Sequence, residues 1–105
     1  MKSPKLSVIV PVYHGEKFIA DNLEIMKKSI AEHFPNFEII AVVDGKVDRS
    51  FEEAEKISDV KVVGYDKNQG KGFALKYGFK HCTGDFVTFI DSDMDLHPEQ
   101  LKNFM

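Results

Sequence analysis

The 105-residue sequence is short of cysteine and of long apolar runs, and each shortage excludes a class of protein. Cys82 stands alone, which rules out an internal disulfide and fits a reducing compartment, so we expect a cytoplasmic protein. No stretch approaches the roughly 20 apolar residues that a membrane-spanning helix needs. The apolar run at 6–12 is too short for a signal-peptide core, and Pro11 interrupts it. Contact with the cytoplasmic face of a membrane would therefore require residues of a longer chain.

The sequence also lacks an excess of positive charge. Its net charge is −3 at pH 7, which gives no reason to expect a nucleic acid as partner. Hydrophobic residues make up 43% and charged residues 30%, a composition typical of a globular protein rather than a disordered one. We expect residues 1–105 to form one domain at most.

Apolar segments alternate with amphipathic ones along the chain. Strands are predicted from short runs rich in branched and aromatic residues, and helices from apolar residues spaced three and four apart. Asp48 and Ser50 are candidates for the N-cap of the second helix, and the third helix follows a polar loop and runs to about Cys82. The predicted strands are residues 6–12, 37–43, 60–64 and 86–90, and the other predicted helices are residues 16–33 and 98–105.

The predicted order alternates strand and helix four times, with connections long enough for crossovers. This order is typical of an α/β protein with a mostly parallel sheet and helices on both faces. In such sheets ligands bind beyond the C-terminal ends of the strands. Four segments far apart in sequence would then converge in space, namely residues 11–16, 43–48, 66–72 and 91–97.

The last of these segments holds two aspartates, Asp91 and Asp93, directly after the apolar strand at 86–90. Two carboxylates at a sheet edge lose hydration and repel each other unless a cation or hydrogen-bond donors compensate. A divalent cation that holds a phosphorylated ligand would do so, because carboxylates suit Mg²⁺ and Mn²⁺. The alternative is an acidic turn that only caps the next helix, and both interpretations stay open from this stretch alone.

The other three segments, taken singly, are more typical of ordinary turns. Tyr13 offers an aromatic face to a nucleotide base, but it would also pack on the rim of a strand-to-helix turn. Asp44 is placed to accept hydrogen bonds from a ribose or a base, yet Asp-Gly is common in turns without a ligand. The loop at 68–72 matches neither the phosphate-binding P-loop nor the dinucleotide fingerprint, so Lys71 is interpreted as a solvated loop charge.

Two known motifs that begin with paired aspartates fit this chain less well. A calcium-binding EF-hand loop needs glycine at its sixth position and glutamate at its twelfth, where this chain has Leu96 and Lys102. Phosphotransferases of the haloacid dehalogenase type have glycine and threonine after the second aspartate, where this chain has Met94 and Asp95. A phosphotransferase with Asp91 as its nucleophile remains an alternative, as does a non-catalytic nucleotide-binding module.

Four motifs together resemble those of one family. The chain has S-V-I-V-P-V-Y at 7–13, E-I-I-A-V-V-D-G at 38–45, N-Q-G-K-G-F-A-L at 68–75, and T-G-D leading to D-S-D at 83–93. Their order and spacing resemble the N-terminal, nucleotide-binding half of inverting family 2 glycosyltransferases with the GT-A fold, especially the polyprenyl-phosphate sugar transferases. The family patterns are V-I-P-x-Y-N-E, E-I-I-x-V-D-D-G, N-x-G-x-x-x-A-L and G-D-x-x-x-x-x-D-x-D.

The resemblance implies a Rossmann-like GT-A fold with a donor site at the strand ends. Asp93 would bind Mn²⁺ or Mg²⁺ that bridges the diphosphate of the donor, and Asp91 would assist as a metal ligand or a nucleotide contact. The residues that the resemblance assigns to the base and ribose are Pro11, Tyr13, Glu16, Val42 and Asp44.

The resemblance also implies partners and a reaction. The donor would be a UDP- or GDP-sugar, the acceptor a lipid phosphate such as a polyprenyl phosphate, or a glycan, and transfer would invert the anomeric centre by direct displacement. The general base and the acceptor site would lie beyond Met105, so residues 1–105 alone would bind a nucleotide poorly and give no turnover. Departures from the family patterns at His14, Val43 and Lys46 leave the base identity and the donor affinity open.

Overall fold

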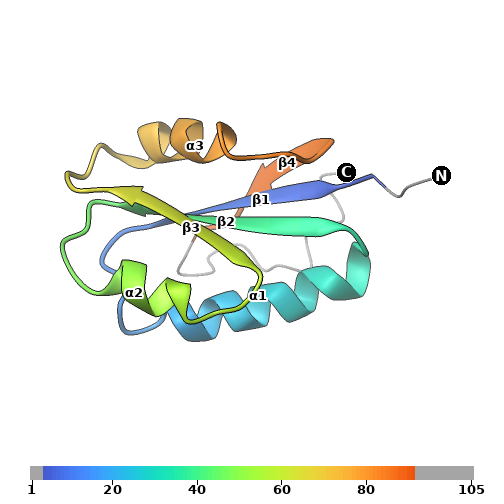
Figure 1. The fold of residues 1–105 in the computed structure, drawn as a ribbon, viewed down its shortest axis with the longest axis horizontal. Coiled ribbons are helices and arrows are strands. Elements are labelled where there is room, and N and C mark those ends of the chain that lie inside the picture. Colours follow the sequence, from blue (N-terminus) through green and yellow to red (C-terminus); the bar gives the residue numbers. More distant parts are fainter. Residues whose placement is uncertain (1–3, 92–105) are drawn as a thin grey trace.

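The computed structural model describes residues 4–91 as a layered α/β fold. Four strands form one sheet in the order β3-β2-β1-β4, and all neighbouring strands are parallel (Figure 1). The predicted α/β architecture is therefore confirmed. Along the chain the elements are β1 (Leu6–Val12), α1 (Ile19–His33), β2 (Phe37–Asp44), α2 (Ser50–Glu55), β3 (Val60–Tyr65), α3 (Lys71–Phe79) and β4 (Phe86–Phe89).

Three helix boundaries differ from the predicted ones. α1 begins at Ile19 rather than at residue 16, because the chain first makes a turn in which Phe18 N and Ile19 N donate to Gly15 O at 3.0 and 2.8 Å. α3 begins inside the predicted loop at 68–72, and it ends at Phe79 rather than at Cys82. The predicted helix at 98–105 lies outside the described residues.

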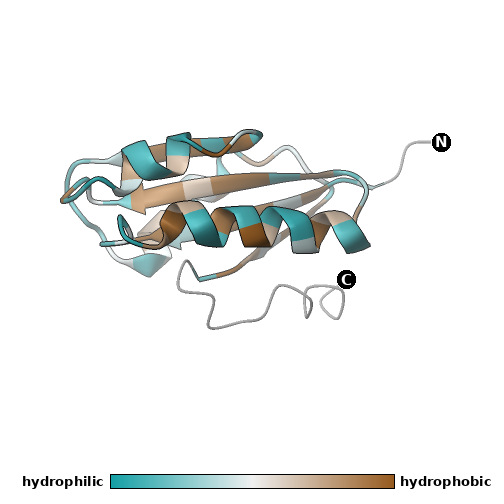
Figure 2. Cartoon of the chain, turned by 90° about the horizontal axis from the view of Figure 1, so that it is seen from below, coloured by the Kyte–Doolittle hydropathy of each residue, from teal (hydrophilic) through white to brown (hydrophobic). Residues whose placement is uncertain are grey.

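α1 and α2 cover one face of the sheet. Apolar residues recur along α1 at three- and four-residue steps, which buries one side of the helix through Ile19, Leu23, Met26 and Ile30. They pack on alternate strand residues that point to this face, among them Val8, Val10, Ile39, Ala41 and Val43. Figure 2 shows this side of the molecule, where the strands are predominantly hydrophobic and α1 alternates between hydrophobic and hydrophilic bands.

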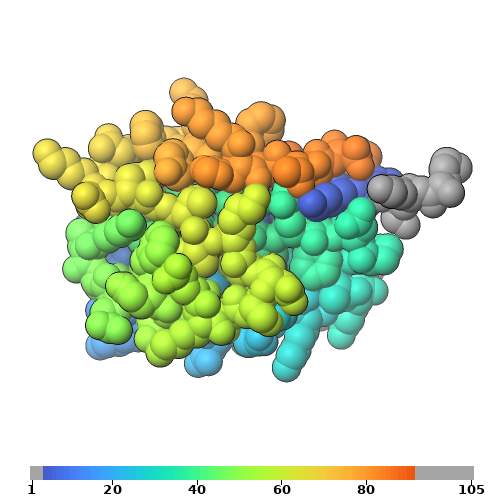
Figure 3. All heavy atoms as spheres, viewed as in Figure 1, coloured from blue at the N-terminus to red at the C-terminus, as the bar shows by residue number. Residues whose placement is uncertain are grey.

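α3 covers the opposite face. Its Ala74 is buried with Ile9, Ile40 and Val42 in a second, smaller core. Gly78 allows the helix to approach closely, since a Cβ there would lie 2.7 Å from Ile9 Cγ2 and 2.9 Å from Val42 Cγ2. Helices on both faces explain why the central strands are nearly all apolar. The space-filling view in Figure 3 shows α3 along the top of the molecule and α2 at the lower left.

β4 exposes apolar side chains, and the helices of the described part are short. β4 forms one edge of the sheet, where it pairs with β1, and its Phe86, Val87 and Phe89 are 47%, 39% and 43% exposed. Among the helices within residues 4–91, none is long and apolar enough to span a membrane.

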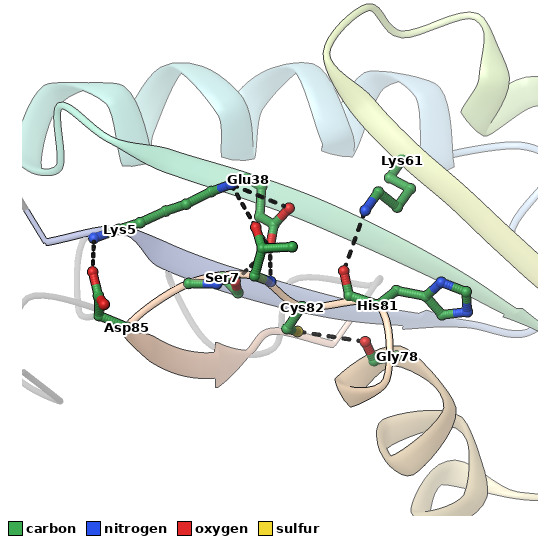
Figure 4. A network of polar contacts seen from close by, with 10 residues as sticks. Lys5, Ser7, Glu38, Lys61, Gly78, His81, Cys82 and Asp85 are labelled. Atoms are coloured by element: carbon green, nitrogen blue, oxygen red, sulfur yellow. Dashed lines mark hydrogen bonds and ion pairs between the residues drawn. The ribbon is translucent and has the colours of Figure 1, made fainter.

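The start of β4 is fixed to β1 and β2 at the N-terminal edge of the sheet (Figure 4). Glu38 Oε2 accepts hydrogen bonds from Ser7 Oγ and Thr83 N, both at 2.6 Å, and Lys5 Nζ lies 3.6 Å from Glu38 Oε1. Gly84 N donates to Ser7 Oγ at 2.9 Å. Burial would raise the pKa of Glu38, but the hydrogen bonds from Ser7 and Thr83 and the charge of Lys5 hold it below its ordinary value.

Candidate functional site

The C-terminal ends of the strands lie at a single edge of the sheet because all four strands are parallel. The loops after β1, β2 and β3 gather on the left of Figure 1. Hydrogen bonds and one ion pair connect these loops in series, from the loop after β1 to Asp91, two residues after the end of β4. The predicted convergence of segments far apart in sequence is therefore confirmed for the described residues.

The loop after β1 is bonded to the loop after β2 through Asp48 and Ser50. Gly15 N donates to the buried Ser50 Oγ at 2.7 Å, and Glu16 N lies 3.4 Å from Asp48 Oδ2. Asp48 Oδ1 in turn accepts hydrogen bonds from Ser50 N at 2.9 Å and from Ser50 Oγ at 2.5 Å. Asp48 therefore holds the start of α2 from two residues before the first residue of the helix. Arg49 is the N-cap residue, so the prediction that Asp48 or Ser50 takes that place is wrong.

Tyr13 and His14 form the exposed tip of the loop after β1. Tyr13 is 47% exposed, and its ring meets the His14 ring edge-on with centroids 4.4 Å apart. His14 has φ +54°, in the left-handed region where asparagine and histidine are enriched, so histidine suits the backbone that the family pattern fills with asparagine.

His14 also lies near an acid of the neighbouring loop, with Nδ1 3.8 Å from Asp48 Oδ2. Burial would raise the pKa of Asp48, but hydrogen bonds from Ser50 and Glu16 and the nearby His14 hold it below its ordinary value. The Asp48 carboxylate is therefore stabilised in its charged form as a link between the two loops.

Asp44 ends β2 and is only 6% exposed. Its Oδ1 accepts hydrogen bonds from Tyr65 Oη and Gln69 N, each at 2.7 Å, and its Oδ2 accepts one from Gly70 N at 3.1 Å. Burial raises the pKa of Tyr65, and the hydrogen bond to Asp44 raises it further. Asp44 thus fixes the loop after β3 and the start of α3. Its predicted contact with a nucleotide stays a prediction beside this role.

The turn after Asp44 packs directly on the loop after β3. Gly45 has φ +91°, and a Cβ there would lie 2.9 Å from both the Cβ and the backbone nitrogen of Asn68. Lys46 N donates to Asp66 O at 3.2 Å. Glycine is therefore required at residue 45 by its backbone angle and by the close contact, independently of any ligand.

Asp91 follows β4 and forms an ion pair with Lys71. Nζ of Lys71 lies 2.7 Å from Oδ1 of Asp91 and 5.2 Å from the centre of the Phe89 ring. Lys71 was interpreted as a solvated loop charge. It is the first residue of α3 rather than a loop residue, and its charge, although 51% exposed, is paired with Asp91. The sequence held a signal for this ion pair: Lys71 stands at the start of the helix that precedes β4, and Asp91 stands just after β4.

Pro11 and Val42 are paired in the register of β1 and β2. Pro11 has no N–H to donate, but the pairing of β1 with β4 ends at Ile9 and Phe89, before Pro11 is reached. Val42 is fully buried beneath α3, in the smaller core with Ile9 and Ala74. Glu16 lies exposed on the loop after β1. The nucleotide contacts predicted for Pro11, Val42 and Glu16 stay predictions.

Asp91 fits one part of a divalent metal site. Its side chain is one-third exposed at a strand end, and carboxylate oxygens are ligands that Mn²⁺ and Mg²⁺ accept. Within residues 4–91, no three histidine, cysteine or acidic side chains are grouped to hold a metal ion. Asp93, the predicted principal ligand, lies outside the described residues. The metal site at Asp91 and Asp93 therefore stays a prediction.

Residues 7–105 match the model of the family described as glycosyl transferase family 2, and this match includes all four strand ends. The chain belongs to glycosyltransferase family 2. The resemblance indicated by the four sequence motifs is therefore confirmed. This family member is 35% identical to the undecaprenyl-phosphate 4-deoxy-4-formamido-L-arabinose transferase of Proteus mirabilis, over 99% of this chain and 33% of that protein.

Two solved structures of glycosyltransferases share the fold. S. aureus TarS 1–349 in complex with UDP-GlcNAc has a TM-score of 0.75 and 34% identity, over 95% of this chain and 30% of that one. Glucosyl-3-phosphoglycerate synthase of Mycobacterium tuberculosis, in complex with Mn²⁺, UDP and phosphoglyceric acid, has a TM-score of 0.73 and 26% identity, over 94% and 37%. The predicted GT-A type of fold is confirmed. The chain spans 30–44% of the length of five curated relatives that it matches.

The residues that carry the family motifs lie at both edges of the sheet. Asp44 and Asp91 lie at the C-terminal edge, whereas Glu38 and Gly84 lie at the N-terminal edge in the hydrogen-bonded network described above. Part of the family pattern therefore specifies how β4 is attached to the sheet and not what binds at the site.

Proposed function

We propose that this chain supplies the donor-binding part of a glycosyltransferase that uses a nucleotide-diphosphate sugar and a divalent metal ion. One observation carries the proposal: Tyr13, Asp44 and Asp91 lie at the ends of three different strands, at the same edge of the sheet. An exposed aromatic ring suits a nucleotide base, and a partly exposed carboxylate suits a metal ion that neutralises a diphosphate. The UDP-GlcNAc bound to TarS and the UDP and Mn²⁺ bound to the mycobacterial synthase support a UDP-sugar donor and Mn²⁺.

The residues of this chain would act by binding and orienting the donor. Asp48 and Ser50 fix the loop that carries Tyr13, and Asp44 fixes the loop that precedes α3. Asp91, with Asp93, would hold the metal ion. When bound, that ion supplies positive charge against the negative charge that develops on the departing nucleoside diphosphate.

The reaction we propose is a single displacement. An acceptor oxygen forms a bond to the anomeric carbon on the face opposite the diphosphate while the bond to the diphosphate breaks, which inverts that carbon. A lipid phosphate is the acceptor class supported by the name of the Proteus relative, and a glycan is the other candidate. The general base is expected beyond Met105.

Titration calorimetry with UDP and GDP, with and without Mn²⁺, tests the donor-binding function. We expect weak nucleotide binding that depends on Mn²⁺ and that is lost in Asp93→Ala. Asp21→Asn is the control, because Asp21 is an exposed acid in the first turn of α1. Nucleotide binding that is indifferent to Mn²⁺ would instead favour a simple binding module, and labelling of Asp91 by beryllofluoride would favour a phosphotransferase.

A further inference from the structure

Lys71 and Asp91 connect the start of α3 to the second residue after β4. Their Nζ and Oδ1 atoms are 2.7 Å apart, and the Lys71 ammonium also lies over the Phe89 ring. The two side chains are 51% and 33% exposed, so water reaches the pair. Ion pairs of this kind contribute little to stability. The Lys71–Asp91 pair can therefore be replaced by other charged partners of the two side chains with little loss of stability.

The backbone that presents Lys71 is fixed. Gly70, the residue before it, has φ +97° and donates its N–H to Asp44 Oδ2, while Gln69 N donates to Asp44 Oδ1. Beside this backbone there is open space among residues 4–91, since a Cβ built at Gly70 or Gly72 would meet none of their atoms within 4 Å. Lys71 thus stands on a rigid support at the site, with room beside it for a ligand.

The charges around Lys71 also favour exchange. Lys71 is a cation at the positive end of the α3 dipole, where cations are disfavoured, and Asp91 offsets that cost. A divalent ion on Asp91 would remove the offset and repel the ammonium. An anionic diphosphate bound to the same ion would offer the ammonium a new, charge-assisted partner.

We propose that Lys71 is a resident counter-ion of Asp91 that is displaced when a divalent metal ion binds and then pairs with the diphosphate of the donor. The inference rests on the proposed donor site and adds a positioning residue to it. Lys71 would weaken metal binding in the absence of nucleotide and strengthen nucleotide binding once the metal is present. Metal and nucleotide would therefore bind cooperatively, each raising the affinity of the other.

Binding of Mn²⁺ to the 105-residue chain, followed by the loss of the electron paramagnetic resonance signal of free Mn²⁺, tests the first half of the proposal. Lys71→Met keeps the aliphatic stem and removes the charge. We expect this change to tighten binding of Mn²⁺ alone by about two- to fivefold, because an exposed competing ion pair is lost. Calorimetry with excess UDP tests the second half, and we expect UDP to bind the Mn²⁺-loaded variant about tenfold more weakly.

Lys76→Met is the matched control, because Lys76 is an exposed lysine in the last turn of the same helix. We expect neither change in this variant, and circular dichroism would verify that both variants are folded. An unchanged affinity for Mn²⁺ alone in Lys71→Met would overturn the counter-ion role. An unchanged affinity for UDP would overturn the transfer to the diphosphate.

The wild-type chain separates this inference from the proposed function. A wild type that binds no Mn²⁺ would overturn the counter-ion proposal as a whole. A wild type that binds Mn²⁺ but no UDP would contradict the donor-binding function and the transfer step, and the Mn²⁺ affinities of the two variants would still decide the counter-ion role of Lys71.

Discussion

The Ser50 hydroxyl accepts the backbone N–H of Gly15 at 2.7 Å, and this bond joins the loop after β1 to the start of α2, 35 residues further along the chain. Ser50 is buried at the start of α2, and Gly15 lies two residues after Tyr13. The loop that carries the exposed Tyr13 ring is thereby held from the neighbouring strand. Its position at the candidate site depends on a hydroxyl that contacts no ligand in our proposal.

Ser50→Ala leaves the Gly15 N–H buried without this acceptor and removes one hydrogen bond to Asp48. We expect a loss of about 1–2 kcal/mol in the free energy of unfolding, measured in urea. UDP binding in the presence of Mn²⁺ should weaken as well, because the Tyr13 loop loses its tether. Ser58→Ala, at an exposed serine that contacts Lys27, is the control, and an equal loss there would contradict the assigned role.

Asp44→Asn tests the clamp on the loop after β3. The amide can retain the two hydrogen bonds received by Oδ1, but its NH₂ group would face the N–H of Gly70. We expect a loss of about 1–3 kcal/mol in unfolding free energy, as is typical when a buried charge-assisted hydrogen bond is removed. Asp66→Asn, at an exposed acid of the adjacent loop, should change stability by much less. Stability equal to that of the wild type in Asp44→Asn would show that the loop is held by other contacts.

Glu38 should make stability depend on pH. Its pKa is lowered in the folded chain from about 4.5, so its contribution is fully present above about pH 4.5 and is lost as the pH falls through the folded pKa. Urea unfolding between pH 3 and pH 7 should therefore show a smaller loss toward acid pH in Glu38→Gln than in the wild type. Glu55→Gln, at an exposed position of α2, should leave the slope unchanged. Identical slopes for Glu38→Gln and the wild type would refute the linkage.

Gly78 and Gly72 form a matched pair in α3. A Cβ at residue 78 would press on Ile9 and Val42 at 2.7 and 2.9 Å, so Gly78→Ala should destabilise the chain by about 1–3 kcal/mol through overpacking. A Cβ at residue 72 would meet no atom of the described part of the chain within 4 Å, and Gly72→Ala should stabilise the helix by up to about 1 kcal/mol. Thermal and urea unfolding of the two variants would measure the difference. If Gly72→Ala destabilised the chain as much as Gly78→Ala or more, the packing of α3 described above would be contradicted.

The central part of the fold could be predicted from the sequence because its signals are local. The strands β1 and β2 are long apolar runs, and the buried side of α1 repeats every three to four residues. The start of α3 was missed because Gly70 and Gly72 are poor helix formers, and there the clamp by Asp44 determines where the helix begins.

The candidate site could be predicted only in part. Parallel strands bring their C-terminal ends to one edge, so the neighbourhood of Tyr13, Asp44 and Asp91 followed from topology alone. The partners of these residues did not follow, because Asp44 with Gln69 and Lys71 with Asp91 are contacts between loops whose shapes depend on the packed fold. A single sequence shows which residue types lie at the C-terminal edge of the sheet. It does not show which of their side chains form hydrogen bonds or ion pairs with one another.

The network around Glu38 sets the position of the Asp91 side chain at the opposite, C-terminal edge of the sheet. Residues 83–85, just before β4, are hydrogen-bonded to Lys5, Ser7 and Glu38. These bonds fix the register in which β4 pairs with β1. A slip of one residue would turn Asp91 to the opposite side of the sheet. A loss of the proposed sugar transfer in variants of Glu38 or Gly84 would then result from a misaligned β4. Such a loss would not mean that either residue contacts the substrate.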